Sequence, residues 1–322
     1  MMIIHGITSE QLNKSILVPI PKDKRKSMNS SNNYRAIALS SIICKTLEYV
    51  VLDRMKTIST SDLQCGFKKN CSTVLCSFLV SESIQYYVNN GSTVYTLFLD
   101  ASKAFDRVNH VTLFNRLIDR GVCPLYLRIV VMMYHVGSAA VKWNDTISET
   151  FKMTNGVKQG SVLSPFLFAL YLDPLLDSIN SSKSGCYIGD LPANAFSYAD
   201  DVVILAPSLT SLKYLIKLCE EYSKTYYVKF NPQKSKVIVF GSSYRPNDIM
   251  INNCQVEVVE GIKHLGISLS AKAHSIYNYE DILNDIKVKS NAMASNFNKL
   301  TIDIVGLKFL KLIVTVFMVV LC

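Results

Sequence analysis

Two adjacent aspartates, Asp200 and Asp201, interrupt an apolar and β-prone run at residues 196–205. Neighbouring carboxylates repel each other, and burial between apolar strands adds a desolvation penalty to that repulsion. A divalent cation would offset both effects, because ions such as Mg²⁺ prefer carboxylate oxygens together with water and phosphate. Asp100 follows a second apolar run at residues 93–99, so the three carboxylates can meet at one edge of a sheet. The pattern predicts a two-metal site; turn aspartates exposed to water are the alternative.

Two metal ions about 4 Å apart can activate a 3′-hydroxyl and stabilise the leaving pyrophosphate of an in-line displacement. The charge balance suits such chemistry. The chain carries 34 Lys and Arg against 25 Asp and Glu, which gives a net charge of +9 and a pI near 9.0. This excess favours a polyanionic partner such as nucleic acid.

The composition describes a globular protein that stays inside the cell. Its 322 residues are 49% hydrophobic and 18% charged, enough for one large domain or two ordinary ones. None of the nine cysteines forms a Cys-x-x-Cys pair, which indicates reduced thiols and an intracellular location in the nucleus or cytoplasm. We expect no signal peptide and no membrane segment, because the most apolar stretch, residues 312–322, falls short of the roughly 20 residues that span a bilayer. That tail is predicted to be a core helix or strand without its partner.

Hydrophobic periodicity predicts the elements that must position these carboxylates. Strands are expected at residues 16–20, 93–99 and 236–240, and on both sides of the aspartate pair. Helices are expected at residues 41–54, 72–88, 111–119, 164–176 and 211–222. Ser164 and Pro165 suit an N-cap and a first helical position. Alternation of strands and helices predicts the α+β class, organised around one sheet.

Seven motifs in a fixed order make this chain similar to the reverse transcriptases of non-LTR (LINE-type) retrotransposons. Three central motifs lie at residues 99–108 (Leu-Asp-Ala-Ser-Lys-Ala-Phe-Asp-Arg-Val), 155–165 (Asn-Gly-Val-Lys-Gln-Gly-Ser-Val-Leu-Ser-Pro) and 198–201 (Tyr-Ala-Asp-Asp). Flanking motifs lie at residues 33–37, 64–67 with Ser72-Thr73, 231–234 and 264–267. The resemblance covers about residues 16–270.

The resemblance implies a right-hand polymerase fold, whose palm is a small antiparallel sheet backed by helices. The expected parts are N-terminal fingers at residues 1–92, a palm with an inserted fingers segment at 93–240, and the palm end with a partial, truncated thumb at 241–322. The reverse transcriptase domain would span about 16–242.

The implied activity is RNA-directed DNA polymerisation, the addition of deoxynucleotides to a primer 3′-hydroxyl with Mg²⁺ or Mn²⁺ as cofactor. The partners would be an RNA template, a DNA primer and deoxynucleoside triphosphates. By resemblance, the metal ligands are Asp100, Asp200, Asp201 and the backbone carbonyl of Ala101. Lys234 matches a lysine proposed to protonate pyrophosphate, with an ordinary surface lysine as the alternative.

Further roles follow from the same resemblance. Arg35 would reach the triphosphate, where a guanidinium can make paired bonds to phosphate oxygens, and Lys22 would assist unless its loop is merely solvated. Phe105 would exclude a 2′-hydroxyl as a steric gate, with a core phenylalanine as the alternative. Gln159 and Gly160 would pack beside the nucleotide and the template, and the residues expected along the template path are Gln64, Gly66 and Phe67.

Some positions depart from the family pattern. Ala36 replaces a proline, Cys65 replaces a bulkier apolar residue, and His264 replaces an aromatic residue in the region that grips the primer. We also expect the chain to be a fragment that lacks the upstream endonuclease, the complete thumb and the C-terminal Cys/His knuckle. The competing hypotheses are a catalytically silent remnant that at most binds nucleic acid, and a templated polymerase from outside mobile elements.

Overall fold

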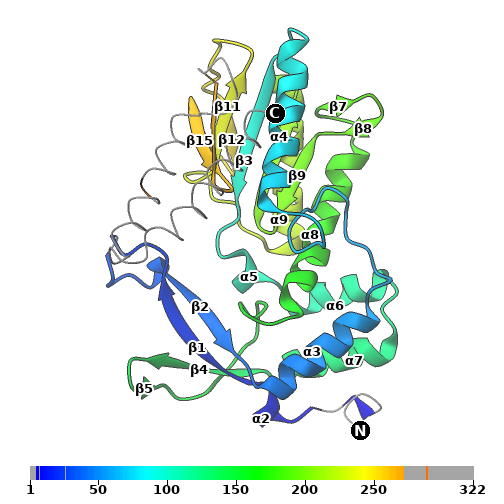
Figure 1. The fold of residues 1–322 in the computed structure, drawn as a ribbon, viewed down its shortest axis with the longest axis vertical. Coiled ribbons are helices and arrows are strands. Elements are labelled where there is room, and N and C mark those ends of the chain that lie inside the picture. The colour runs from blue at the N-terminus through cyan, green and yellow to red at the C-terminus, as the bar shows by residue number, and fades with distance from the viewer. Residues whose placement is uncertain (1–4, 7, 26, 272–287, 289–322) are drawn as a thin grey trace, which may run out of the picture.

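The computed structural model, which describes residues 5–6, 8–25, 27–271 and 288, contains two five-stranded sheets (Figure 1). We call the first the central sheet. Its strands, in spatial order, are β14 (Glu257–Val258), β11 (Lys236–Phe240), β3 (Val94–Asp100), β10 (Asp201–Ala206) and β9 (Ala195–Tyr198). Neighbouring strands are antiparallel except for β11 and β14, which are parallel.

Helices cover both faces of the central sheet. Successive side chains of each strand point to opposite faces, and apolar residues on both faces are buried under these helices. On one face, Leu97 of β3 and Ile204 of β10 belong to a core shared with α8 (Ser164–Ser181) and α9 (Leu209–Tyr226). On the other face, Phe98 and Val203 pack in a smaller core with α4 (Thr73–Asn89) and with a hairpin. This hairpin consists of β15 (Gly261–His264) and β16 (Ile267–Ser270).

The second sheet lies below the central sheet in the view of Figure 1. Its strands are β2 (Tyr34–Leu39), β1 (Lys14–Pro21), β4 (Ser138–Trp143), β5 (Thr146–Ile147) and β6 (Phe151–Lys152). The other helices bounded within the described residues are α2 (Glu10–Asn13), η1 (Ser31–Asn33), α3 (Ile42–Arg54), α5 (Ala104–Arg107), α6 (His110–Asp119) and α7 (Pro124–His135). Two small hairpins pair β7 (Tyr187–Ile188) with β8 (Leu191–Pro192) and β12 (Met250–Ile251) with β13 (Cys254–Gln255).

These elements confirm the predicted α+β class and all five predicted helices, whose ends shift by a few residues. Ser41 and Ser72 cap α3 and α4, each accepting a hydrogen bond at 3.1 Å from the backbone N–H three residues later. The prediction of Ser164 as an N-cap was wrong, since the helix begins at Ser164 itself and follows Leu163. The second sheet was not predicted, and the apolar tail at residues 312–322 lies outside the described residues.

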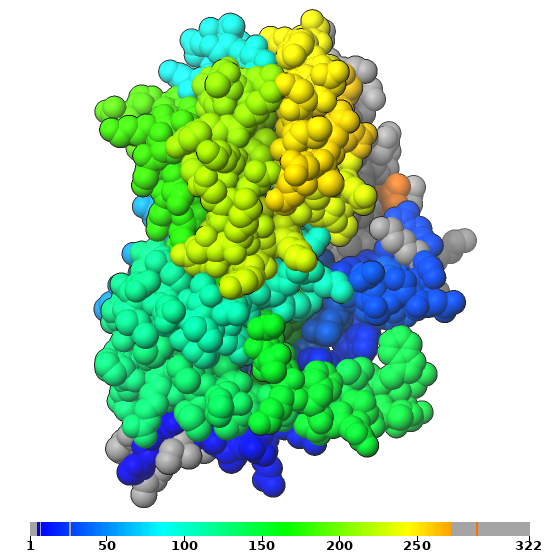
Figure 2. Space-filling model, turned by 180° about the vertical axis from the view of Figure 1, so that it is seen from behind, coloured from blue at the N-terminus to red at the C-terminus, as the bar shows by residue number. Residues whose placement is uncertain are grey.

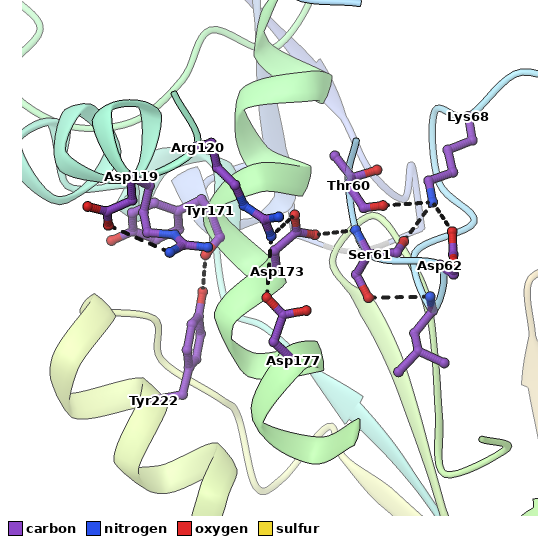
Figure 3. A network of polar contacts seen from close by, with 12 residues as sticks. Thr60, Ser61, Asp62, Lys68, Asp119, Arg120, Tyr171, Asp173, Asp177 and Tyr222 are labelled. Carbon is purple, nitrogen blue, oxygen red and sulfur yellow. Dashed lines mark hydrogen bonds and ion pairs between the residues drawn. The ribbon is translucent and has the colours of Figure 1, made fainter. Parts of the chain in front are cut away.

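A buried aspartate ties α8 to two loops (Figure 3). Asp173 has no solvent exposure, and its carboxylate accepts hydrogen bonds from the Arg120 guanidinium at 2.9 Å and from the Ser61 backbone N–H at 3.0 Å. Burial raises the pKa of Asp173 to about 6 even though these two donors act in the opposite direction. Asp173 therefore anchors the loop that leads from Ser61 toward the central sheet.

Asp173→Ala should lower the free energy of unfolding by about 3 kcal/mol, because it leaves Arg120 and the Ser61 N–H without their buried acceptor. Asp177 is a matched control: it lies one turn further along α8 and also bonds Arg120, at 3.3 Å, but its side chain is 54% exposed. Asp177→Ala should change stability by less than about 1 kcal/mol. Urea unfolding checks both values, and equal losses in the two variants would contradict the anchoring role.

Candidate active site

The aspartate pair lies in a tight turn between β9 and β10. Tyr198 pairs with Asp201, so Ala199 and Asp200 form a two-residue hairpin loop. Ala199 adopts a φ of 58°, in the left-handed region. In the neighbouring strand, Asp100 pairs directly with Asp201. The register thus brings the ends of β3 and β10 together at one edge of the central sheet, as predicted from the sequence.

The three carboxylates affect each other electrostatically. Burial, and then the charge of Asp100, raise the pKa of Asp200. Asp201 is exposed at the surface, yet partial desolvation and then the carboxylates of Asp200 and Asp100 raise its pKa to about 6. The Arg35 guanidinium opposes both shifts. A cation among these groups would favour their ionised forms.

Asp100 provides a direct test of whether a cation fits. Its Oδ2 atom is shielded from water and accepts no hydrogen bond within the described structure. The Lys234 ammonium is 3.8 Å from this oxygen, beyond hydrogen-bonding distance. Within the described ranges no three His, Cys, Asp or Glu side chains enclose a metal site by themselves. An ion here would therefore take further ligands from water and phosphate, as Mg²⁺ commonly does.

A short loop, residues 229–235, supports the end of β3. The Ser235 hydroxyl accepts a hydrogen bond from the Asp100 backbone N–H at 3.1 Å, and the Asp100 carbonyl accepts one from the Asn231 N–H at 2.9 Å. Lys234 belongs to this loop and reaches back toward Asp100. The predicted lysine motif is thus placed beside the predicted metal ligand.

A cavity of about 1270 Å³ lies between the central sheet and the second sheet. Figure 2 shows the molecule from behind, with a hollow between the blue N-terminal part of the second sheet and the green part of the same sheet around β4 and β5. Most of the predicted site residues line the cavity: Lys22, Arg35, Phe67, Asp100, Ala101, Phe105, Gln159, Gly160, Asp200 and Lys234. The structure thus brings together residues from six of the seven motifs.

Five cationic side chains line this cavity: Lys22, Arg35, Lys103, Lys158 and Lys234. Their mutual influence is visible at Lys22, whose pKa is lowered by partial burial and then by the positive charges of Lys234, Arg35 and Lys103. Lys22 also donates a hydrogen bond to the Asn32 carbonyl at 3.1 Å. Such a concentration of positive charge in a cavity that also holds carboxylates suits an anionic ligand that carries its own metal.

Phe105 is half-buried and takes part in both the core and the cavity. Its ring stacks on Phe168 with centroids 4.5 Å apart and meets the edge of Phe67 at 6.4 Å. Gln159 donates a hydrogen bond to Asp106 Oδ1 at 3.2 Å. Gly160 has a φ of 107°, and a Cβ there would lie 3.0 Å from the Ala38 carbonyl of β2, so glycine permits this close approach.

Three predicted residues lie away from the large cavity. Gln64 and Gly66 are buried against the β9–β10 turn, so any influence on a template path is indirect. Asp201 lines a second cavity of about 140 Å³, together with Lys234 and His264. His264 is buried against the Phe98 ring, and the desolvation lowers its pKa to about 4.

The sequence analysis missed an aromatic pair on the second sheet. Tyr34 and Trp143 line the large cavity with ring centroids 5.3 Å apart. They come from β2 and β4, which are both neighbours of β1. Their proximity could not be read from spacing, although Trp143 is the single tryptophan of the chain. The sequence analysis also missed Lys103 as a cavity residue, because in that motif it assigned roles only to Asp100, Ala101 and Phe105.

Comparisons with known proteins point to the family that the sequence motifs indicated. Residues 20–269 match the family model described as reverse transcriptase (RNA-dependent DNA polymerase). A Pol polyprotein from the type-2 retrotransposable element R2DM of Drosophila melanogaster is 26% identical over 70% of this chain and 21% of that protein. A 149 kDa protein of transposon TX1 from Xenopus laevis is 25% identical over 82% of this chain and 20% of that protein.

A probable RNA-directed DNA polymerase from the Drosophila melanogaster transposon X-element is 26% identical over 84% of this chain and 31% of that protein. The chain thus spans between 20% and 31% of the length of these three relatives. Among solved structures, apo telomerase from Candida tropicalis, truncated from its C-terminal domain, matches with a TM-score of 0.56 at 12% identity. The match covers 82% of this chain and 55% of that one, and it shows the right-hand polymerase fold.

Proposed function

The chain belongs to the reverse transcriptase (RNA-dependent DNA polymerase) family, and we propose that it adds deoxynucleotides to the 3′-hydroxyl of a primer paired with an RNA template. Its relatives are reverse transcriptases of non-LTR retrotransposons. The observation that carries the proposal is one cavity lined both by Asp100 and Asp200 and by five cationic side chains. A nucleoside triphosphate has the matching charge pattern.

The family generally uses divalent metal ions, and we propose Mg²⁺ or Mn²⁺ here. Asp100, Asp200, Asp201 and the Ala101 carbonyl would hold the ions, which supply charge stabilisation to the phosphates when bound. The Oδ2 atom of Asp100, which accepts no hydrogen bond within the described structure, and the raised pKa of Asp200 support this assignment.

The remaining residues bind and orient the substrate in this proposal. Arg35 and Lys22 contact the triphosphate, and Lys234 holds a proton that can pass to the leaving pyrophosphate. Phe105 borders the sugar, while Gln159 and Gly160 border the nucleotide and the template. Phe67 contributes to the template path directly, and Gln64 and Gly66 contribute through the turn that they support.

We assign residues 1–92 to the fingers, 93–240 to the palm with an inserted fingers segment, and 241–322 to the palm end and a partial, truncated thumb. The parallel pairing of β4 with β1, which joins part of the second segment to the sheet of the first, supports the inserted fingers segment. Within the described residues, no helix combines the length and the apolarity needed to cross a bilayer. An intracellular site of action, in the nucleus or cytoplasm, belongs to the same proposal.

Primer extension on an RNA template tests the proposed function. The wild-type chain should add deoxynucleotides in the presence of Mg²⁺ or Mn²⁺, and Asp200→Asn should not. Binding of the template–primer without any extension, under either metal, would overturn the proposal in favour of a silent remnant. Extension on DNA templates alone would favour a polymerase from outside mobile elements.

Arg35→Ala should raise the KM for deoxynucleoside triphosphates by about tenfold or more, since a charged hydrogen bond to phosphate contributes about 1.5–3 kcal/mol. Arg25 serves as the control because it is an exposed arginine near the same strand pair, with its ion pair to Asp23. Steady-state extension kinetics should show a normal KM for Arg25→Ala. Equal KM values for the two variants would exclude Arg35 from the triphosphate site.

A further inference from the structure

Gln64 is a buried glutamine whose side chain is fully hydrogen-bonded. It has no solvent exposure. Its Oε1 atom accepts hydrogen bonds from the backbone N–H groups of Gly66 at 2.8 Å and Ala199 at 3.0 Å. Its Nε2 atom donates to Ser197 Oγ at 3.1 Å and to the Ala199 carbonyl at 3.3 Å. All four hydrogen-bonding positions of the amide are therefore used, and three of the four bonds go to the β9–β10 hairpin.

Gln64 bonds to Ala199, whose backbone conformation is unfavourable. Ala199 has a φ of 58°, which crowds the Cβ of any L-residue other than glycine. The side-chain amide bonds both the N–H and the carbonyl of Ala199, and the Ser197 hydroxyl donates a further hydrogen bond to that carbonyl at 3.0 Å. Asp200 follows Ala199 directly, so the same bonds determine where its carboxylate lies.

The backbone around Gln64 strengthens this contact. The Leu63 carbonyl accepts a hydrogen bond from the Ser197 N–H at 2.8 Å, and the Cys65 N–H donates one to the Ser197 carbonyl at 2.7 Å. This segment thus lies along β9 as a short parallel addition to the sheet. A Cβ on Gly66 would lie 2.3 Å from the Ala199 nitrogen, so only glycine fits beside the turn.

We propose that Gln64 is a positioning residue, whose side-chain amide sets the conformation of the Ala199–Asp200 turn and thereby the location of the Asp200 carboxylate relative to Asp100. The expected effect on kcat rests on the proposed function, whereas the claim that Gln64 holds the turn does not. Gln64 does not line the large cavity, and it acts on the reaction through the hairpin.

Gln64→Met is the main test, because methionine has a similar shape but makes none of the four hydrogen bonds. We expect kcat for nucleotide addition to fall by about tenfold to a hundredfold, since small misplacements of a catalytic group have effects of this size. The KM for deoxynucleoside triphosphates should change by less than about twofold, because the triphosphate contacts are intact. The affinity for Mn²⁺, measured by electron paramagnetic resonance without primer or template, should fall several-fold.

Asn194→Leu provides the matched control. Asn194 is also a fully buried amide, next to β9, and it donates hydrogen bonds to the Ile179 and Ser184 carbonyls at 3.2 Å each. Its bonds do not reach the turn, so Asn194→Leu should shift the urea midpoint while leaving kcat and Mn²⁺ affinity unchanged at temperatures where the protein is folded. The same kinetic profile in both variants would overturn the proposal.

A double-mutant cycle tests the structural part without any activity. Glycine accepts a positive φ freely, so in an Ala199→Gly background the change Gln64→Met should shift the urea midpoint less than it does in the wild type. Equal shifts in the two backgrounds would overturn the claim that Gln64 holds this conformation.

Ser197→Ala covers the case in which Gln64→Met does not fold. It removes the hydroxyl that both accepts from Gln64 and donates to the Ala199 carbonyl, without adding bulk. It should lower kcat and Mn²⁺ affinity in the same direction, and unchanged values would contradict the proposal. If the wild type itself fails to extend primers, the proposed function is wrong, whereas the cycle still decides whether Gln64 holds the turn.

Discussion

Asp200→Ala should reduce nucleotide addition by at least about a thousandfold, because it removes a carboxylate that would offset metal charge in the transition state. Asp100→Ala should have an effect of the same order. Neither change should unfold the protein. The pKa of Asp200 is raised in the folded state, so its ionised form lowers stability at pH values above that pKa. Removing this charge should leave the urea midpoint at pH 7 unchanged or higher.

Asp190→Ala is the control for this prediction. Asp190 occupies the second position of the two-residue loop between β7 and β8, as Asp200 does between β9 and β10. It is exposed and lies outside both cavities. Asp190→Ala should extend primers at the wild-type rate. Comparable extension by Asp200→Ala and Asp190→Ala would remove the basis for the metal assignment.

Phe105→Ala should lower the preference for deoxynucleotides over ribonucleotides by about tenfold to a hundredfold. The ring lines the cavity and is held in place by Phe168 and Phe67, so it can exclude a 2′-hydroxyl only while that stack persists. Because specificity is a ratio of kcat/KM values, both nucleotides must be measured with the same variant.

Phe114→Ala separates the steric role from a loss of core packing. Phe114 is another half-buried phenylalanine; it packs near His110 and Tyr134 and lies outside the cavity. We expect a lower urea midpoint with an unchanged sugar preference. If Phe105→Ala shows this same pattern, Phe105 is a core residue and the gate assignment is wrong.

Much of the chemistry could be predicted from short segments of the chain. The strands that end at Asp100 and begin at Asp201 follow from local runs of apolar and β-branched residues, and the structure confirms both. The starts of helices α3 and α4 are also determined locally, because each follows a serine whose side chain caps the first turn. The family and its α+β fold were predicted from ordered motifs and are confirmed by the comparisons.

Other features were decided only by the tertiary structure. In the second sheet, β1 pairs in parallel with β4, which lies more than a hundred residues later in the chain. No local sequence pattern could therefore predict this pairing. Gln64 and Ala199, which are 135 positions apart, meet only because the segment before α4 lies along β9. Sequence identifies a glutamine in a motif, but its surroundings decide whether it faces a template or holds a turn. Periodicity and capping act within a few residues, whereas hydrogen-bond partners across a core are selected by packing and by the requirement that buried polar groups be satisfied.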